Sequence, residues 1–309
     1  MFETVATCLE SQLAPDGAEL LYVVCENGPS DPRVKSRLAA MGERTGRQTE
    51  YVHEGRLGIP FARNAVLERA LAVGATHVAF IDDDETADPD WIAQLFAGLV
   101  KSGAGLVGGP VICSVDPDLR LGFWQRRVAA GMISDRVRRN EKFRKFVAQG
   151  KGGKICLATN NWLCDLAVLQ RLGLRFREEI GLGSGSDTAF WHDFKALGGS
   201  SSWVPDAVVR ETLPIGRLRP GYVVARGKSH AAAEWERRVK ANTRAGRLRA
   251  MVFILNHGIA GAIGAGVGVL FSPYVLYRGL YAMGRALGRS SALLSGRSGV
   301  RLYEKVQGN

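Results

Sequence analysis

Three consecutive aspartates, Asp82, Asp83 and Asp84, directly follow an apolar run in the segment HVAFIDDDETADPDW. Like charges crowded together repel one another, and a partly enclosed carboxylate also loses hydration. Such a cluster therefore requires either full solvation or a cation. A surface turn meets the first condition, and a metal site meets the second.

The position of the aspartates favours the metal site. Asp82 and Asp84 are two residues apart at the carboxyl end of a predicted buried strand, so their side chains lie on one side of the chain. Carboxylates so placed suit Mg²⁺ or Mn²⁺, which prefer oxygen ligands and leave coordination positions open for phosphate oxygens. The sequence thus predicts a cluster stabilised by a divalent cation together with a diphosphate.

Strand and helix patterns alternate around the aspartates. Apolar, β-branched runs predict buried strands at 19–28, 77–82 and 105–113. Helical patterns cover 2–13, 60–73 and 88–100, the last with Asp88 as N-cap and Pro89 at its first position. This alternation predicts an α/β fold with an open, mostly parallel sheet and helices on both faces. Ligands of such sheets bind at the carboxyl ends of strands, where the aspartates fall.

Four segments carry a resemblance to a known family: YVVCENGPSD, GRLGIPFARNAVLERA, FIDDDETADPDWI and GLGSGSDTAFWHDFKALGG. In this order and spacing they resemble the family 2 glycosyltransferases of the GT-A, Rossmann-like fold, and in particular the branch that synthesises exopolysaccharides such as succinoglycan. The resemblance runs from about residue 9 to residue 214. It implies that the first two segments hold the nucleotide of a nucleotide-sugar, through Glu26, Asn27, Arg63 and Asn64.

The other two segments would carry the metal and the chemistry. The resemblance implies that Asp82 and Asp84 ligate Mn²⁺ or Mg²⁺ and that Asp82 and Asp83 also contact the nucleotide. Asp187 matches the family's catalytic base, which accepts a proton from the acceptor hydroxyl. Ser186 replaces the usual Glu, and an acid at a helix start is also an ordinary feature of helix N-termini.

Further residues could contact the acceptor or the leaving diphosphate. Residues 154–173 predict a strand, a polar turn at Asn160 and Asn161, and a helix, which the resemblance implies is an acceptor-side wall. Trp162 could stack on a sugar, although a buried core Trp is the favoured interpretation. Arg217 suits a diphosphate, but a solvated basic loop is an equal alternative. The resemblance also implies a metal-binding His near the end of this region, where this chain has Arg210 and Glu211, so the third protein ligand of the metal stays open.

The start of the chain departs from the family pattern. Relatives begin with a strand and a Pro-Thr-Tyr-Asn-like loop that forms part of the nucleotide pocket, whereas this chain begins at the helix that should follow. We therefore expect either a missing N-terminal extension or impaired donor binding.

Composition bounds the partners and the compartment. The 309 residues have a formal net charge of +11, which implies an anionic partner: nucleic acid, a phosphorylated small molecule or an acidic membrane. Five scattered cysteines without a C-x-x-C pair indicate a reduced, cytoplasmic compartment. Aromatic residues are interleaved with basic ones at 120–154, which suits a membrane surface, a phosphorylated lipid acceptor or nucleic acid. A solvated helix is an equal alternative.

The C-terminal part has the composition of a membrane segment. Residues 251–271 contain no Lys, Arg, Asp or Glu, and basic residues flank this stretch on both sides. A span, an interfacial or re-entrant hairpin and a buried helix all remain possible. We predict a GT-A domain at 1–225 with a basic insertion at 120–154, a basic juxtamembrane segment at 226–250, a hydrophobic hairpin or membrane anchor at 251–288, and a polar tail at 289–309.

Together these features predict an inverting glycosyltransferase at the cytoplasmic face of the inner membrane. It would move a sugar from a nucleotide-sugar, most simply a UDP-sugar, to a saccharide or polyprenyl-diphosphate-linked acceptor in cell-surface polysaccharide synthesis. Anionic membrane lipid is a further expected partner, and nucleic acid is not. The alternative is a truncated, inactive relative that binds a membrane or a synthase partner.

Overall fold

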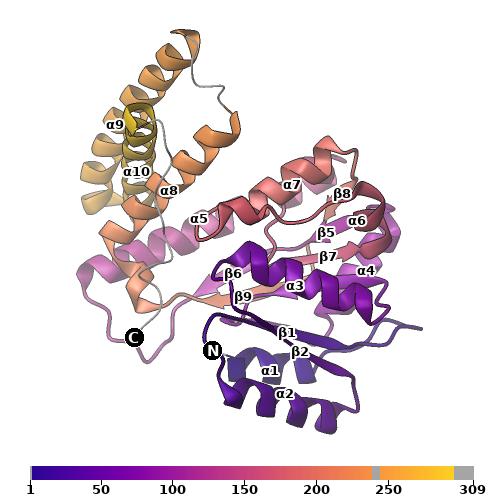
Figure 1. Ribbon diagram of the computed structural model, residues 1–309. Coiled ribbons are helices and arrows are strands. Elements are labelled where there is room, and N and C mark those ends of the chain that lie inside the picture. The colour runs from indigo at the N-terminus through magenta and orange to yellow at the C-terminus, as the bar shows by residue number, and fades with distance from the viewer. Residues whose placement is uncertain (1, 239–243, 296–309) are drawn as a thin grey trace. The chain divides into compact units, whose positions relative to one another are not determined.

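The computed structural model describes residues 2–238 and 244–295 (Figure 1). The chain forms two compact units. Unit 1 comprises Met1–Ile112, Arg139–Gly181 and Ser186–Glu211, and unit 2 comprises Cys113–Arg138, Leu182–Gly185 and Thr212–Asn309.

Unit 1 alternates strands and helices as the sequence predicts. Its first elements are α1 (Phe2–Glu10), β1 (Tyr22–Asn27), α2 (Pro32–Thr45), β2 (Thr49–Glu54), α3 (Ile59–Ala72), β3 (His77–Ile81), β4 (Glu85–Ala87), α4 (Trp91–Ser102), β5 (Leu106–Gly108) and β6 (Val111–Ser114). After the long helix α5 (Phe123–Ala148) follow η1 (Gly152–Lys154), β7 (Asn161–Asp165), α6 (Leu166–Leu172), η2 (Glu178–Ile180), α7 (Ser186–Ala196), β8 (Ser201–Trp203) and β9 (Val209–Thr212). The predicted basic insertion at 120–154 thus forms α5 and η1.

The strands form three sheets of mixed direction, where the sequence suggested one mostly parallel sheet. β1 and β2 are parallel, and β3-β7-β5-β8 form a second sheet in which β7 runs antiparallel to both β3 and β5, while β5 and β8 are parallel. The third sheet has the order β4-β9-β6, with β4 and β9 antiparallel. Antiparallel β7 between β3 and β5 is the main reason for the difference.

Hydrophobic clusters cover both faces of the central sheet, as expected. On one face, α3, α6 and α7 pack on Trp162, Phe176 and Phe190, whose rings contact one another. On the other face, α4 packs through Trp91 and Leu95. Strand β7 serves both faces, because Trp162 belongs to the first cluster and the next residue along, Leu163, to the second.

Three local predictions were wrong. Helix α4 begins at Trp91 with Asp90 as N-cap, so Asp88 caps nothing and instead pairs with Arg210 at 2.8 Å. The predicted strand 105–113 is broken after Gly108, because Gly109 admits the carbonyl of Ala207, which would lie 2.0 Å from any Cβ there. The strand predicted before Asn160 follows it instead, as β7.

Unit 2 is helical. It contains the first part of α5, η3 (Ile215–Leu218), α8 (Pro220–Arg238), α9 (Arg244–Phe271) and α10 (Pro273–Ser295). The predicted hydrophobic hairpin at 251–288 coincides with most of α9 and α10. Residues 289–295 of the predicted polar tail belong to α10, and the rest of the tail, from residue 296, lies outside the described residues.

Candidate active site

The three aspartates lie in the tight turn that joins β3 to β4. The backbone N–H of Glu85 donates to the Asp82 carbonyl at 3.2 Å, and the Asp82 N–H donates to the Glu85 carboxyl, also at 3.2 Å. These reciprocal bonds fix the turn at the carboxyl end of a strand that is packed on both faces. The chain thereby holds Asp82, Asp83 and Asp84 together in spite of their mutual repulsion.

Arg63 of α3 brings three of the predicted motifs together. Its guanidinium lies 3.9 Å from the Asp82 carboxylate and donates to the Ser186 hydroxyl at 3.1 Å. It also lies over the Phe176 ring, 5.4 Å from the centroid, and only 13% of the side chain is exposed. The aspartate turn, the start of α3 and the start of α7 therefore meet at one cation.

The environment of Asp82 disfavours a negative charge. Half of its side chain is accessible, so a solvent ion can reach it. The protein around the rest of the carboxylate removes hydration and raises its pKa to about 6, against the opposing attraction of Arg63. The charges of Asp84, Asp83 and Asp187 raise this pKa further.

Asp187 directly follows Ser186, whose hydroxyl is bound by Arg63 beside Asp82. Asp187 lies in the first turn of α7, and its carboxylate accepts the backbone N–H of Thr188 at 2.8 Å. Its charge makes the smallest of the contributions that raise the pKa of Asp82. The structure thus gathers the predicted base and the predicted metal ligands at one edge of unit 1.

Glu85 is a member of the site that the sequence analysis missed. It is 1% exposed, accepts a hydrogen bond from Asn160 and faces Glu211 across the β4–β9 pair. Burial, with the charges of Asp82 and Glu211, raises its pKa to about 9, so Glu85 is protonated at neutral pH. The available signal was the fourth acid of the DDDE run, which begins a strand rather than ending a turn.

A divalent cation fits this donor set. Asp82 and Asp84 offer hard oxygen ligands, and burial together with the neighbouring carboxylates raises the pKa of Asp82 in spite of the nearby Arg63 cation. Among the described residues no group of three or more His, Cys, Asp or Glu side chains is arranged to hold a metal. The chain would thus supply one or two carboxylates, and a substrate diphosphate would complete the coordination, as is common for Mg²⁺.

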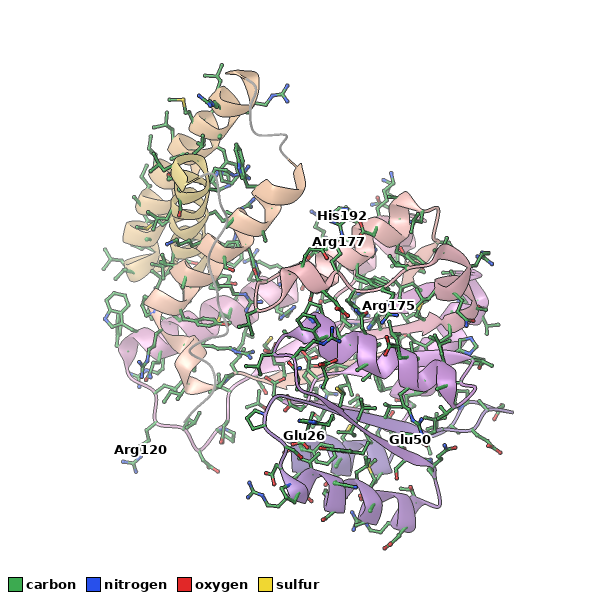
Figure 2. The ribbon with its side chains drawn as sticks, viewed as in Figure 1. Glu26, Glu50, Arg120, Arg175, Arg177 and His192 are labelled. Atoms are coloured by element: carbon green, nitrogen blue, oxygen red, sulfur yellow. The ribbon has the colours of Figure 1, made fainter. Side chains whose placement is uncertain are left out.

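The first nucleotide motif forms the junction between β1, β2 and α3. Glu26, at the end of β1 (Figure 2), accepts the N–H of Asp31 at 2.9 Å and the hydroxyl of Tyr51. Asn27 donates to the Arg56 carbonyl at 2.7 Å and accepts the N–H of Gly58 at 2.8 Å. Asn27 therefore positions the loop before α3, while a nucleotide contact by Glu26 stays a prediction.

Asn64 has a different part from the predicted one. It is 2% exposed, and its amide exchanges hydrogen bonds with the backbone N–H and carbonyl of Phe176 at 2.9 and 3.0 Å. No surface of Asn64 is available to a nucleotide in this arrangement. It instead fastens the segment that carries the Phe176 ring under Arg63.

Two of the predicted acceptor contacts are core residues. Asn161 and Trp162 are each 2% exposed, and Asn161 accepts the Trp91 indole N–H at 2.9 Å. The favoured interpretation of Trp162 as a core residue is confirmed. Asn160 reaches the site through Glu85, and Arg217 lies in η3 of unit 2, where its proposed diphosphate contact stays a prediction.

Comparison with known proteins shows the family of this chain. The model of the family described as "Glycosyl transferase family 2" matches residues 2–163, which is more than half of the chain. The chain belongs to glycosyl transferase family 2. It is therefore a glycosyltransferase with the α/β GT-A fold, and residues Arg63, Asp82 and Asp84 lie within the matched part.

This family 2 glycosyltransferase is also similar to individual proteins. It is 27% identical over 231 residues to "Succinoglycan biosynthesis protein ExoM" of Rhizobium meliloti (strain 1021), covering 72% of this chain and 67% of that protein. Crystal structures of S. aureus TarS 1-349 superpose with TM-scores of 0.49 in complex with UDP-GlcNAc and 0.47 in complex with UDP. Each is 12% identical and covers 96% of this chain and 88% of the other.

Proposed function

We propose that this chain transfers a sugar from a UDP-sugar to a saccharide or polyprenyl-diphosphate-linked acceptor, with inversion, during exopolysaccharide synthesis. The observation that carries the proposal is the Arg63 guanidinium, which joins the aspartate turn to the start of α7. The 27% identity to a protein named for succinoglycan biosynthesis supports the polysaccharide role.

Asp82 and Asp84 would hold Mn²⁺ or Mg²⁺ at the end of β3. When bound, the cation supplies positive charge that stabilises the leaving diphosphate. Arg63 lies beside Asp82, so its guanidinium also faces the region where the diphosphate would lie, and Phe176 fixes its orientation from below. Glu26 and Asp83 would contact the nucleoside part.

Asp187 would act as the base. Its carboxylate takes the proton of the acceptor hydroxyl while that oxygen attacks the anomeric carbon on the face opposite the leaving group, which inverts the configuration. The hydrogen bond from the Thr188 N–H holds one carboxylate oxygen and leaves the other for the acceptor. The neighbouring Ser186 hydroxyl accepts a hydrogen bond from Arg63. This contact therefore orients the Arg63 guanidinium and also positions Asp187, the base.

We place the chain at the cytoplasmic face of a membrane. All five cysteines lie in the described part of the chain and none of them is in a disulfide, which agrees with a reducing compartment. Among the described residues one helix, Gly246–Phe271, is long and apolar enough to cross a bilayer. A lipid-linked acceptor and anionic lipids would be met there, and the segments at 226–250 and 251–288 would be the juxtamembrane and anchoring parts.

Thermal unfolding of the full chain with nucleoside diphosphates, with and without Mn²⁺, tests the donor site. At about one hundred times the dissociation constant, a ligand should stabilise the folded state by roughly 2.7 kcal/mol. We expect this increase only when UDP and Mn²⁺ are both present. No increase with UDP or with any other nucleoside diphosphate would contradict the proposal and favour an inactive relative.

A further inference from the structure

Helix α9 exposes a continuous apolar face. Met251–Phe271 contains no charged residue, and little of the apolar window within Gly246–Phe271 is buried in the protein. The exposed side chains recur every three or four residues, so they follow one face of the helix. They are 47–79% exposed: Leu248, Met251, Val252, Leu255, Ile259, Ile263, Val267, Leu270 and Phe271.

The opposite face of α9 packs closely on α10. A Cβ at Gly268 would lie 2.1 Å from the backbone N of Leu276, and one at Gly261 would lie 2.8 Å from Met283. A Cβ at Gly279 would lie 2.3 Å from the backbone N of Ala265. Glycines at these positions let two helices approach at backbone distance, which fixes the direction of the exposed face.

Helix α10 packs just as closely on α8, so α10 is the middle helix of three. A Cβ at Gly284 would lie 2.1 Å from the Val224 carbonyl oxygen, and one at Gly288 would lie 2.1 Å from that of Lys228. Arg285 pairs with Glu234 of α8 at 2.6 Å. The charged residues of α9 all lie before Met251, whereas α8 carries them along its length: Arg226, Lys228 and Glu234.

This packing is incompatible with a hairpin that crosses the bilayer. If α9 and α10 spanned the hydrocarbon, α8 would enter it beside α10 and bring the charge of Lys228 and the Arg285–Glu234 ion pair with it, which is costly at the bilayer centre. The far end of the hairpin is also held by α5, since Arg127 donates to the Gly268 carbonyl at 2.5 Å and Arg138 lies over the Tyr274 ring. The far end of α9 therefore lies beside charged side chains of α5, and its start shares a buried cluster, through Ala250, with Trp235 of α8.

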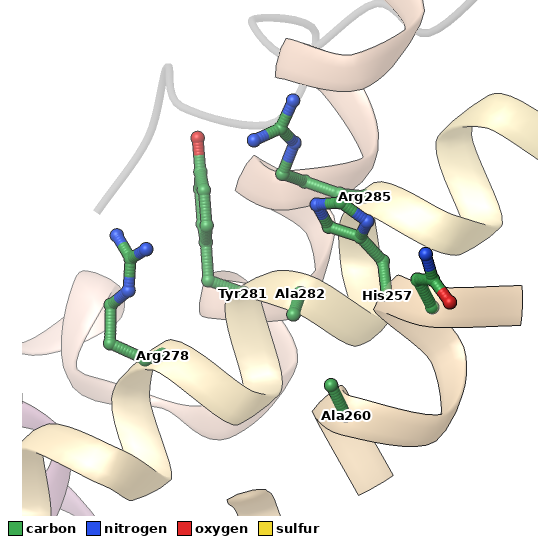
Figure 3. A pocket seen from close by; sticks show the side chains of 7 residues that line it. His257, Ala260, Arg278, Tyr281, Ala282 and Arg285 are labelled. Atoms are coloured by element: carbon green, nitrogen blue, oxygen red, sulfur yellow. The ribbon is translucent and has the colours of Figure 1, made fainter. Parts of the chain in front are cut away.

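Cations lie along one edge of the apolar face. Arg278 and Arg285 project from α10 on either side of Tyr281 and line a pocket of about 310 Å³ with Asn256 and Ala260 of α9 (Figure 3). Arg247 and Arg249 are exposed at the start of α9. An almost wholly apolar hollow of about 420 Å³ opens near the other end, lined by Trp124 and Val269. An apolar strip with arginines at its edge complements the acyl chains and phosphates of an anionic bilayer.

We infer that α9 lies in the plane of an anionic phospholipid bilayer, with its exposed apolar face immersed at the level of the acyl chains, and does not cross it. This inference rests on the membrane association proposed above and concerns its geometry. The helix would be immersed by about 5–10 Å, as interfacial helices are. The exposed Arg247 and Arg249 would face lipid phosphates, whereas Arg278 is paired with Asp135 and Arg285 with Glu234. Helix α8 would stay on the aqueous side.

Flotation of the full chain with vesicles tests the surface. We expect binding to vesicles of phosphatidylcholine and phosphatidylglycerol, and weaker binding to phosphatidylcholine alone. Ile259→Asp places a charge on the apolar face and should reduce binding at least about tenfold, because burying an aspartate at the acyl level costs more than 1.4 kcal/mol. Leu197→Asp is the matched control, since Leu197 is 50% exposed in unit 1 and its replacement should leave binding unchanged.

Depth measurement separates the in-plane geometry from a span. A nitroxide is attached to cysteines placed singly at Val252, Ile259 and Val267, with Cys25 and Cys156 replaced by serine. An in-plane helix puts all three labels at similar depth. A spanning helix separates the first and last labels by roughly 22 Å in depth, from 1.5 Å per residue.

The possible results contradict different parts of the inference. Labels at graded depth would overturn the in-plane geometry and leave the membrane association standing. Failure to bind any vesicle would overturn both, and would make a protein partner the occupant of the apolar face. Neither result would affect UDP and Mn²⁺ binding, which tests the donor site separately.

Discussion

The two units depart from ordinary globular surfaces in opposite ways. Unit 1 crowds carboxylates together where a protein normally spreads them in water, and the pKa values of Asp82 and Glu85 rise accordingly. Unit 2 exposes a strip of leucine, isoleucine and valine on α9 that a protein normally buries. Each arrangement is unfavourable in the isolated chain, because Arg63 offsets only part of the carboxylate charge and the strip of α9 lacks an apolar neighbour.

The difference between the units indicates what each has to bind. Crowded carboxylates beside Arg63 become favourable when a cation and an anion arrive together, as a metal and a diphosphate do. An apolar strip becomes favourable against any large apolar surface, whatever its detailed chemistry. The site in unit 1 therefore requires side chains fixed to fractions of an ångström, whereas the face in unit 2 requires only a continuous strip and a rigid helix pair behind it.

Removing the proposed base of unit 1 should have the largest effect of the changes considered, and the effect should be on turnover. Asp187→Asn keeps the size of the side chain and can still accept the Thr188 N–H through its carbonyl oxygen, but it cannot take a proton. We expect turnover to fall by about 10²–10⁴-fold, the usual contribution of a general base, with UDP affinity in Mn²⁺ changed less than about twofold. Single-turnover rates and UDP titrations measure the two quantities. Unchanged turnover would remove Asp187 from the mechanism.

Removing a metal ligand should impair ligand binding by unit 1 and leave membrane binding by unit 2 unchanged. Asp84→Ala deletes one carboxylate from the turn, so the stabilisation by UDP with Mn²⁺, roughly 2.7 kcal/mol at a hundredfold excess over the dissociation constant, should disappear. Vesicle binding should be unchanged, because it depends on α9. Asp90→Ala is the control, since Asp90 is an exposed residue of the same segment and should keep the UDP effect. Persistent Mn²⁺-dependent binding in Asp84→Ala would show that the aspartates are a surface turn.

The close approach before α3 can be tested by adding a single methyl group. Gly58 has φ +142°, and a Cβ there would lie 2.8 Å from the Gly181 carbonyl oxygen. Gly58→Ala should destabilise the fold by about 1–3 kcal/mol and shift Arg63, which follows in the same helix, away from Ser186. Chemical denaturation and turnover are the measurements. Gly74→Ala, at φ +77° with nothing within 4 Å, separates backbone strain from the contact, and equal effects of the two variants would contradict the positional role.

Much of the fold followed from the sequence, because periodicity and turn residues act locally. The strands at 77–82 and 19–28 and the helix at 60–73 form close to where the patterns place them. The direction of β7 and the break at Gly109 did not follow, because each depends on a partner strand or carbonyl distant in the chain. A pattern within one segment contains no information about which segment lies beside it.

The site followed from the sequence only in part, and for the same reason. The D-x-D spacing and the order of motifs predicted the residues that meet at Arg63. Burial decided the others: Asn64 and Asn161 match polar positions of the family pattern but are enclosed, each 2% exposed. Glu85 was missed because its importance comes from facing Glu211, which lies more than a hundred residues away in the chain.

The smallest expected effect is on stability: the crowding of carboxyl groups in unit 1 should make the free energy of unfolding depend on pH. The pKa of Glu85 is about 9 in the folded protein, against an ordinary value near 4.3 in the unfolded chain. Between these values the folded state holds a proton that the unfolded state has lost, so the free energy of unfolding falls as pH rises through this window. Glu85→Gln cannot ionise and should lose that dependence. Between about pH 5 and pH 9 its melting temperature should therefore rise by a few degrees relative to that of the original chain.

Melting curves in the presence of a chelator would isolate this effect from metal binding. Glu141→Gln removes an exposed carboxylate of α5 and should follow the original chain at every pH. A Glu85→Gln variant that tracks the original chain in the same way would mean that the buried carboxyl ionises freely, and that the crowding is relieved within unit 1 without a cation. The contrast between the two units would then no longer hold for unit 1. It would still hold for unit 2, because the exposed strip of α9 has no titrating group and its need for a partner does not change with pH.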